Sequence, residues 1–248
     1  PLLEFTNVSQ KNVDCFSNTN AAIDIQASGG TPSYSFALDS VVFQANGLFD
    51  SLGAGSYTVW VVDDSNCVSQ LAVNISEPLL LTLEIGIQVD VACFGDSTAY
   101  IDLLPSGGST VYELSLDSMD FQANGLFTNL IAGSYTFWVR DDSSCTSRIE
   151  AEVTQPLPLE FILAEQVDVD CFGNDNGFVD VQASGGVPNY VFSIDGSSFQ
   201  DSGRFAGLTP GEHLILLLDD NACTAELTVD IFEPALLELF PEKQDVSC

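Results

Sequence analysis

Apolar and polar residues alternate over short stretches along the whole chain. In the stretch 22–27, for example, Ile23 and Ile25 fall on one side and Asp24 and Gln26 on the other. This period of two predicts a half-buried β-strand, and no segment shows a convincing helical period of 3.6 residues. Strands of roughly 5–9 residues, separated by turn signals every 8–12 residues or so, are typical of a small β-sandwich. The pattern therefore predicts an all-β protein.

The same pattern occurs three times, in the stretches 45–67, 123–145 and 201–223, at a fixed spacing of 78 residues. A fixed internal period of this length indicates a repeat architecture. Prolines at the junctions divide the chain into repeats at 1–77, 78–155 and 156–233, and we expect 234–248 to be the first strand of a truncated fourth repeat. We predict tandem immunoglobulin-like β-sandwiches of about 78 residues each, arranged end to end by short, rather stiff linkers.

The excess of acidic over basic residues limits the classes of partner that the chain is expected to bind. The 248 residues include 36 acidic and 5 basic ones, for a formal net charge of −31. Nucleic acid is disfavoured, because phosphate binding needs clustered Lys and Arg. No apolar run approaches the ~20 residues of a membrane span, so we expect no membrane insertion. The acidity favours solubility and mutual repulsion along a surface protein, with cation binding as the alternative. We interpret the chain as a fragment of a longer exported protein.

The strongest chemical signal is the regular spacing of cysteines. Two fall in each repeat and a seventh falls at Cys248, with no CxxC pair and only one histidine, so zinc fingers are not expected. Regular pairs in small β domains predict disulfides and an oxidising setting. If an even number of strands separates the two cysteines of a repeat, they pair within it as Cys15–Cys67, Cys93–Cys145 and Cys171–Cys223, which leaves Cys248 unpaired. Pairing of sequence neighbours, as Cys67–Cys93, Cys145–Cys171 and Cys223–Cys248, is the alternative.

Acidic residues beside these cysteines are candidates for calcium ligands. Calcium takes six to eight oxygen ligands, and carboxylates with loop carbonyls would supply them. Asp is equally common in β-turns, and no EF-hand loop is present, so the turn interpretation is favoured and calcium is the only cofactor considered. The candidates are Asp63, Asp64, Asp96, Asp141, Asp142, Asp175, Asp219 and Asp220.

Catalytic chemistry finds little support. His213 stands where the other repeats have Tyr57 and Tyr135, which indicates a substituted core residue rather than a base. With no second histidine, a catalytic triad has no partners, and we expect no enzyme activity. Trp60 and Trp138 face away from the inward tyrosines. They either pack on the sheet or, if exposed, form platforms for sugar rings.

The motifs Cys-Phe-Gly-Asn-Asp-Asn-Gly at 171–177, Ala-Gly-Ser-Tyr at 54–57, Asp-Asp-Ser-Asn-Cys at 63–67 and Glu-Pro at 77–78 closely resemble the SprB repeat. This family is found in very long cell-surface adhesins of Bacteroidetes, including adhesins of gliding motility. The resemblance covers essentially the whole chain. The first repeat departs from it at 16–20, and the third at 213–218, where His213 replaces the tyrosine.

The resemblance implies export by the type IX route and display on filaments outside the outer membrane. It also implies a glycoprotein, because this lineage often modifies Asp-Ser-hydrophobic sites; the candidates are Ser40, Ser51, Ser97 and Ser118. We expect a structural stalk segment that supports adhesion and gliding, with a carbohydrate-binding array as the alternative. The expected partners are neighbouring repeats of the same chain and, through other regions, surface polysaccharide or the substratum.

Overall fold

The computed structural model of the chain describes residues 1–38 and 40–239. Its secondary structure consists of strands, and no helix occurs among the described residues, so none there is long and apolar enough to cross a membrane. The prediction of an all-β protein is confirmed. Contacts divide the chain into two compact units. Unit 1 holds residues 1–88, 101–127 and 134–151, and unit 2 holds residues 89–100, 128–133 and the chain from Glu152 onward.

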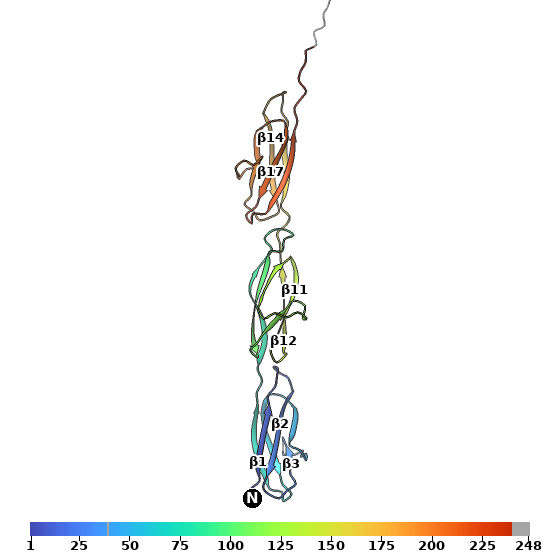
Figure 1. Cartoon of the computed structure of the whole chain (residues 1–248), viewed down its shortest axis with the longest axis vertical. Helices are drawn as coiled ribbons and strands as arrows, with labels where there is room; N and C mark the ends of the chain where they lie inside the picture. The colour runs from blue at the N-terminus through green and yellow to red at the C-terminus, as the bar shows by residue number, and fades with distance from the viewer. Residues whose placement is uncertain (39, 240–248) are drawn as a thin grey trace, which may run out of the picture. The chain divides into compact units, whose positions relative to one another are not determined.

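Strands in the first repeat form two sheets of three (Figure 1). One sheet has the order β1-β2-β4 and the other the order β3-β5-β6, with antiparallel pairing throughout. The strands are β1 (Glu4–Lys11), β2 (Ala21–Ser28), β3 (Ser35–Ala37), β4 (Leu48–Leu52), β5 (Gly55–Val62) and β6 (Val68–Ile75).

Twelve further strands repeat this plan with the sheet orders β10-β8-β7, β12-β11-β9, β13-β14-β16 and β15-β17-β18. In the second repeat they are β7 (Leu79–Val89), β8 (Ala99–Gly108), β9 (Glu113–Ser115), β10 (Leu126–Leu130), β11 (Gly133–Arg140) and β12 (Thr146–Val153). In the third they are β13 (Glu160–Val167), β14 (Gly177–Ser184), β15 (Val191–Ile194), β16 (Arg204–Leu208), β17 (Gly211–Leu218) and β18 (Thr224–Ile231).

The strand order identifies the fold. In an immunoglobulin sandwich the strands A, B and E share one sheet, and C, F and G share the other. The first repeat has this arrangement when β1 to β6 are taken as A, B, C, E, F and G. A single antiparallel bridge pairs Phe36 of β3 with Gln44, which lies in the stretch between β3 and β4. The repeats are therefore immunoglobulin-like sandwiches, as the alternating pattern predicts.

The alternation of side chains fills the space between the two sheets. Ile23 and Ile25 of β2 face Val59 and Val61 of β5, and all four are at most 2% exposed. The third repeat builds the same core from Val179, Val181, Ile215 and Leu217. Burial of one such aliphatic side chain contributes about 1.5–3 kcal/mol, so these core positions stabilise each sandwich strongly.

Hydrogen bonds define the two ends of the first sandwich. At the end that we call the near end, the Gly30 amide donates to the Pro1 carbonyl (3.0 Å). At the opposite, far end, the Val13 amide after β1 donates to the Ser76 carbonyl after β6 (3.1 Å). The chain thus begins at the near end and leaves the sandwich at the far end. The third repeat has the corresponding far-end bond from Val169 to Phe232 (3.1 Å).

Candidate functional site: the cysteine joints

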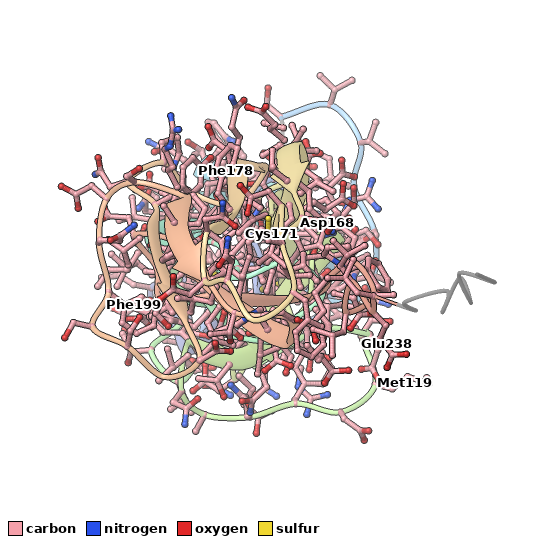
Figure 2. The ribbon with its side chains drawn as sticks, turned by 90° about the horizontal axis from the view of Figure 1, so that it is seen from above. Met119, Asp168, Cys171, Phe178, Phe199 and Glu238 are labelled. Atoms are coloured by element: carbon pink, nitrogen blue, oxygen red, sulfur yellow. A yellow bond between two sulfur atoms is a disulfide. The ribbon has the colours of Figure 1, made fainter. Side chains whose placement is uncertain are left out.

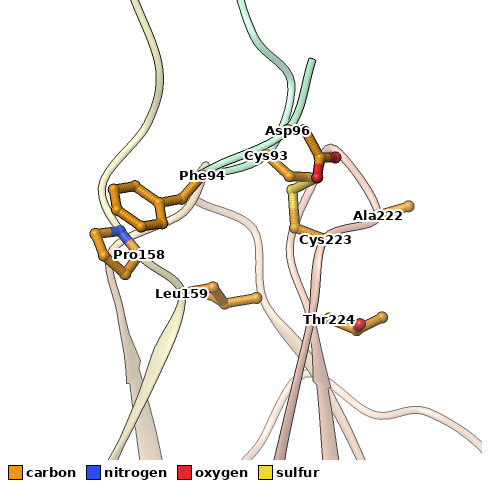
Figure 3. Close-up of a pocket in the computed structure, with 8 residues that line it drawn as sticks. All are labelled: Cys93, Phe94, Asp96, Pro158, Leu159, Ala222, Cys223 and Thr224. Atoms are coloured by element: carbon orange, nitrogen blue, oxygen red, sulfur yellow. A yellow bond between two sulfur atoms is a disulfide. The ribbon is translucent and has the colours of Figure 1, made fainter. Parts of the chain in front are cut away.

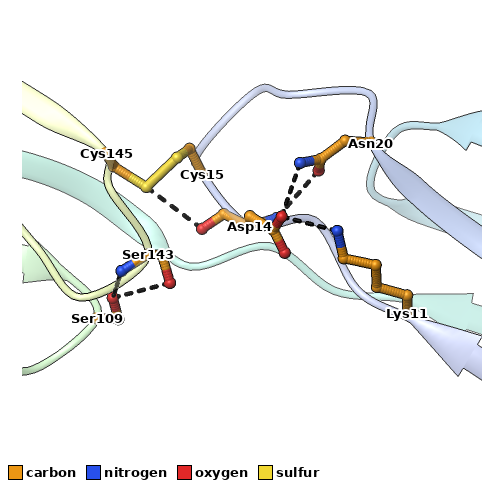
Figure 4. A network of polar contacts seen from close by, with 7 residues as sticks. All are labelled: Lys11, Asp14, Cys15, Asn20, Ser109, Ser143 and Cys145. Carbon is orange, nitrogen blue, oxygen red and sulfur yellow. Dashed lines mark hydrogen bonds and ion pairs between the residues drawn. A yellow bond between two sulfur atoms is a disulfide. The ribbon is translucent and has the colours of Figure 1, made fainter.

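Two disulfides join successive repeats, one inside each compact unit. In unit 1, Cys15 of the first repeat is bonded to Cys145 of the second, with 5.7 Å between their Cα atoms (Figure 4). The Cys145 sulfur also lies 3.4 Å from the carbonyl oxygen of Asp14, a contact that is no hydrogen bond because a disulfide sulfur has no proton. The carboxylate of Asp14 is fixed by Lys11 Nζ at 2.8 Å and by Asn20 Nδ2 at 2.9 Å. We call this arrangement joint 1.

Joint 2, in unit 2, has the same construction. Cys93 of the second repeat is bonded to Cys223 of the third, again with 5.7 Å between the Cα atoms (Figure 3). Asn221 Nδ2 donates to the carbonyl of Ala92 (2.9 Å), which lies beside the Cys223 sulfur. The ring of Phe94 lies against Pro158 at the edge of a shallow cavity of about 430 Å³. Both bridges span 130 residues of sequence.

These bridges correct both pairings that the sequence suggests. Cys15 follows β1 and therefore lies at the far end of its sandwich, where Val13 meets Ser76. Cys67 follows β5, which runs antiparallel to β6, so it lies at the near end. The two cysteines of one repeat are consequently a strand length apart and cannot bond. Pairing of sequence neighbours is also wrong, and Cys248 lies outside the described residues.

A junction residue braces each cysteine loop. Glu77 Oε2 accepts a hydrogen bond from the Ser17 amide (2.6 Å), and Gln155 Oε1 accepts one from the Gly95 amide (2.8 Å). In the third repeat, Glu233 Oε2 accepts from the Gly173 amide (2.9 Å). The side chain before each junction proline thus ties the last residues of a repeat to its first cysteine loop. Sequence inspection shows the recurring Glu/Gln-Pro pair but missed this role, because the partner lies about 60 residues away.

A buried aspartate shapes the hairpin that carries the other cysteine. Asp63 is only 4% exposed, and its Oδ1 accepts hydrogen bonds from the amides of Ser65 (2.9 Å) and Cys67 (2.8 Å). Its Oδ2 accepts a third from the Thr31 amide (2.8 Å). The Thr31 amide is the main cause that holds the pKa of Asp63 below its ordinary value, against the opposing effect of burial. Asp141 and Asp219 make the corresponding three bonds.

The same aspartate explains the paired glycines after the second strand of each repeat. A Cβ on Gly30, which has a positive φ of 57°, would collide with Asp63 Oδ2. Gly108 and Gly186 stand in the same relation to Asp141 and Asp219. A residue with a side chain would therefore displace the carboxylate that organises the cysteine hairpin.

Calcium coordination gains no support from this geometry. The carboxylates of Asp63, Asp141 and Asp219 are already taken by backbone amides. Over residues 1–38 and 40–239, no group of three or more His, Cys, Asp or Glu side chains is placed to hold a metal ion. Asp64, Asp96, Asp142, Asp175 and Asp220 are exposed singly. The structure thus shows a turn-forming role for Asp63, Asp141 and Asp219, and the roles of the other five stay predictions.

His213 lies in β17 at the position that Tyr57 holds in β5, and it is buried, as the sequence predicts. In the first repeat the hydroxyl of Tyr57 donates to the carbonyl of Gly53 (3.0 Å), the tyrosine corner of immunoglobulin-like domains. In the third, His213 Nε2 donates to the carbonyl of Thr209 (2.9 Å) and Nδ1 contacts Asp195 Oδ2 (2.6 Å). A carbonyl and a carboxylate both accept, so the ring is best satisfied with both nitrogens protonated.

This arrangement shifts both titrating groups of the corner. The Thr209 carbonyl and the Asp195 carboxylate raise the pKa of His213, although burial opposes them. Burial acts to raise the pKa of Asp195, but the hydrogen bonds from His213 and the Leu214 amide and the imidazolium charge outweigh it and lower that pKa. The histidine is 8% exposed and serves as a structural hydrogen-bond donor.

The tryptophans are half-buried on the outer face of the β3-β5-β6 and β9-β11-β12 sheets. The guanidinium of Arg148 covers Trp138 at 5.5 Å from the ring centroid, which is packing of the cation–π kind. The candidate glycosylation sites Ser40, Ser51, Ser97 and Ser118 are all exposed, and their modification stays a prediction.

Two cysteines in the described part of the chain are free. Both are exposed: Cys67 lies at the near end of the first repeat, and Cys171, labelled in Figure 2, lies at the far end of the third. Each disulfide joins the first cysteine of one repeat to the second cysteine of the next repeat. Under this rule, the second cysteine of the first repeat (Cys67) and the first cysteine of the third repeat (Cys171) have no partner among the three repeats.

The fold and the joints define an array of disulfide-linked immunoglobulin-like repeats, a construction typical of oxidising, extracellular surroundings. The particular family follows from the sequence comparison: the SprB repeat model matches residues 7–43, 85–121 and 163–199. The chain carries three SprB repeats, and it is a repeat segment of the cell-surface adhesin type. No curated protein matches the sequence.

Solved structures show distant similarity. Three N-terminal domains of the outer capsid protein Hoc of bacteriophage RB49 are 15% identical, with a TM-score of 0.41, covering 94% of this chain and 100% of that one. Fibronectin(III)-like modules of Clostridium thermocellum CbhA are 15% identical, with a TM-score of 0.29. The match covers 66% of this chain and 100% of that one. The eight N-terminal Ig domains of Down Syndrome Cell Adhesion Molecule are 13% identical, with a TM-score of 0.35. The match covers 93% of this chain and 32% of that one. The fold assignment rests on the strand order rather than on these scores.

Proposed function

We propose that the chain is a load-bearing stalk segment of an exported cell-surface adhesin, in which the cysteine joints transmit tension from repeat to repeat. The observation that carries the proposal is the bonding of Cys15 to Cys145 and of Cys93 to Cys223. Each bridge connects the far end of one sandwich to the near-end hairpin of the next. Tension that enters a repeat at its first strand can therefore cross to the next repeat without passing through the remaining strands.

The SprB resemblance supports a setting for this role. It favours secretion by the type IX route in Bacteroidetes, display outside the outer membrane, and a contribution to adhesion and gliding. The strongly acidic surface, with a net charge of −31, keeps neighbouring filaments apart by repulsion. A non-catalytic role fits the side chains: the one histidine is a corner residue, and the three most buried aspartates serve backbone amides. The adhesive partner would be bound by other regions of the longer protein.

Force spectroscopy tests the proposal. The chain is pulled between its termini with the bridges oxidised and again after reduction. Each bridge closes 130 residues, so reduction should release at least that much additional chain, about 430–470 Å when fully extended. The double variant Cys15→Ser with Cys93→Ser should show the long extension without reductant. Cys67→Ser is the matched control, because it removes a thiol outside the bridges. Equal extensions before and after reduction would refute the load path.

A further inference from the structure

The two free cysteines occupy half-sites that are already formed. At the far end of the third repeat, the Gly173 amide is braced by Glu233 and the Asn174 amide donates to the Cys171 carbonyl (3.1 Å). Joint 2 has the same two bonds, Gly95 to Gln155 and Asp96 to Cys93 (3.1 Å). A cavity of about 390 Å³ beside Cys171 shares four lining positions with the cavity at joint 2. Cys171, Phe172, Leu236 and Leu237 stand there at the positions of Cys93, Phe94, Pro158 and Leu159.

The near-end hairpin of the first repeat is the complementary half. The Asp63 amide donates to the Cys67 carbonyl (3.1 Å) and Asp63 Oδ1 accepts from the Cys67 amide, as at Asp141 and Cys145 in joint 1. Asn66 has a positive φ of 63°, and Ser144 at the same position of joint 1 has 65°. The hairpin backbone therefore has the same form with and without a bonded partner.

The cysteines of the two half-sites are more exposed than those of the closed joints. Cys145 and Cys223, which lie in closed joints, are 9% and 8% exposed, whereas Cys67 and Cys171 are both in the exposed class. The residue before the first cysteine follows the same rule: Asp14 and Ala92 are half-buried and Asp170 is exposed. Preformed geometry lowers the ordering cost of docking, so a surface of this kind favours association with its complement.

We propose that Cys171 and Cys67 are the two halves of a third joint, through which the array docks head to tail with further SprB repeats. The occupant at Cys171 is a near-end hairpin of the Asp-Asp-x-x-Cys type, and a second copy of this chain presents one at Cys67. The contact is heterologous, so it propagates in one direction rather than closing a symmetric dimer. The inference deepens the proposed function, because it extends the covalent load path beyond these three repeats.

The bond forms by thiol–disulfide exchange with a small disulfide as the oxidant. The Cys171 thiolate attacks one sulfur of glutathione disulfide and releases one glutathione thiolate. The thiolate of the incoming Cys67 then attacks the Cys171 sulfur of the mixed disulfide and releases the second glutathione. Two protein thiols are oxidised to one disulfide, one glutathione disulfide is reduced, and the two protons lost by the protein thiols are taken up by the two glutathione thiolates to give two thiols.

The test oxidises the full chain with glutathione disulfide in the Cys248→Ser background, at 0.15 M salt to screen the acidic repulsion. Non-reducing peptide mapping should show cross-linked multimers in which Cys67–Cys171 peptides exceed the like pairs Cys67–Cys67 and Cys171–Cys171 together by roughly tenfold or more, the preference that a modest docking free energy supplies. Adding Cys67→Ser or Cys171→Ser should stop growth beyond the dimer. A 1:1 mixture of the two variants should give mainly the mixed dimer.

Random pairing would give the mixed and like bonds in equal amounts, and that result, or an absence of multimers, would overturn the inference. The same map reads the Cys15–Cys145 and Cys93–Cys223 peptides. Their loss would remove the basis of the proposed function. Their presence together with random pairing at Cys67 and Cys171 would leave the proposed function intact and reject only the third joint.

Discussion

The two compact units share one joint design and differ at one corner. Both have a bridge of 130 residues and a hairpin held by a buried aspartate. The corner in unit 1 is made by Tyr57, and in unit 2 by His213 with Asp195. In each case the side chain donates to the carbonyl four residues earlier. The comparison shows that both units keep a side-chain donor to this carbonyl, whereas the donor group itself differs and decides how the unit responds to pH.

The largest effect should come from the shared design. Cys145→Ser should destabilise unit 1 and Cys223→Ser should destabilise unit 2, each by about 5 kcal/mol in the chain-entropy model for a loop of 130 residues. Chemical denaturation separates the units, because both tryptophans lie in unit 1 and their fluorescence follows it alone, while circular dichroism follows both. Equal stability of the variants and the parent would contradict a structural role of the joints.

Truncation at the corner should have the next largest effect. His213→Ala removes a buried side chain and its bond to Thr209, so it should destabilise unit 2 by roughly 2–3 kcal/mol. The expected signature is a loss in circular dichroism at lower denaturant with the tryptophan transition unchanged. A simultaneous shift of the tryptophan transition would mean that the corner does not act on unit 2 alone.

Removing only the donor atom in unit 1 should cost less. Tyr57→Phe keeps the ring and deletes the hydroxyl that bonds Gly53, so a loss of about 1 kcal/mol is expected. Tryptophan fluorescence should report this loss directly. Thr58→Ser at a nearby, exposed position of β5 is the control and should leave the stability within about 0.5 kcal/mol of the parent.

The pH dependence should separate the two corners. The pKa of His213 is raised in the folded unit, so its contribution is full below the unfolded value of about 6.5 and is lost as pH rises through the folded pKa. The pKa of Asp195 is lowered, so its contribution is present above about 3.9 and is lost as pH falls through the folded pKa. Unit 2 should therefore weaken as pH rises above about 6.5. Denaturation midpoints by circular dichroism between pH 6 and 9 measure this effect.

The smallest change should come from exchanging the corners. His213→Tyr should leave the stability of unit 2 near neutral pH almost unchanged and should abolish its decline toward pH 9. The tyrosine hydroxyl can donate to Thr209 but has no proton to lose in this range. A decline that persists in this variant would assign the pH dependence to other groups.

Some structural features could be predicted from the local sequence pattern alone. The alternation of Ile23 and Ile25 with Asp24 and Gln26 predicts β2 and its buried face, and the structure confirms both. The substitution of Tyr57 by His213 is visible in the aligned repeats and correctly indicates a core position. These features depend on neighbours in sequence or on the 78-residue period, so the residues themselves carry the signal.

The cysteine pairing shows where local pattern ends. The spacing of cysteines predicts that bridges exist, but the partner depends on which end of the sandwich each cysteine occupies. That end is set by the direction of β5 relative to β1 and by the short extended segment at Gln44 between β3 and β4. No local motif reveals either feature. The brace from Glu77 to Ser17 is hidden for the same reason.

The sequence by itself determined the strands, the repeat, the immunoglobulin-like class and the presence of disulfides in this protein. Alternation, period and cysteine spacing are properties of the chain and need no tertiary structure to be recognised. Only the tertiary structure decided that Cys15 bonds to Cys145 rather than to Cys67. A disulfide requires two Cα atoms within about 7 Å, and only the folded path of the strands brings the right pair that close.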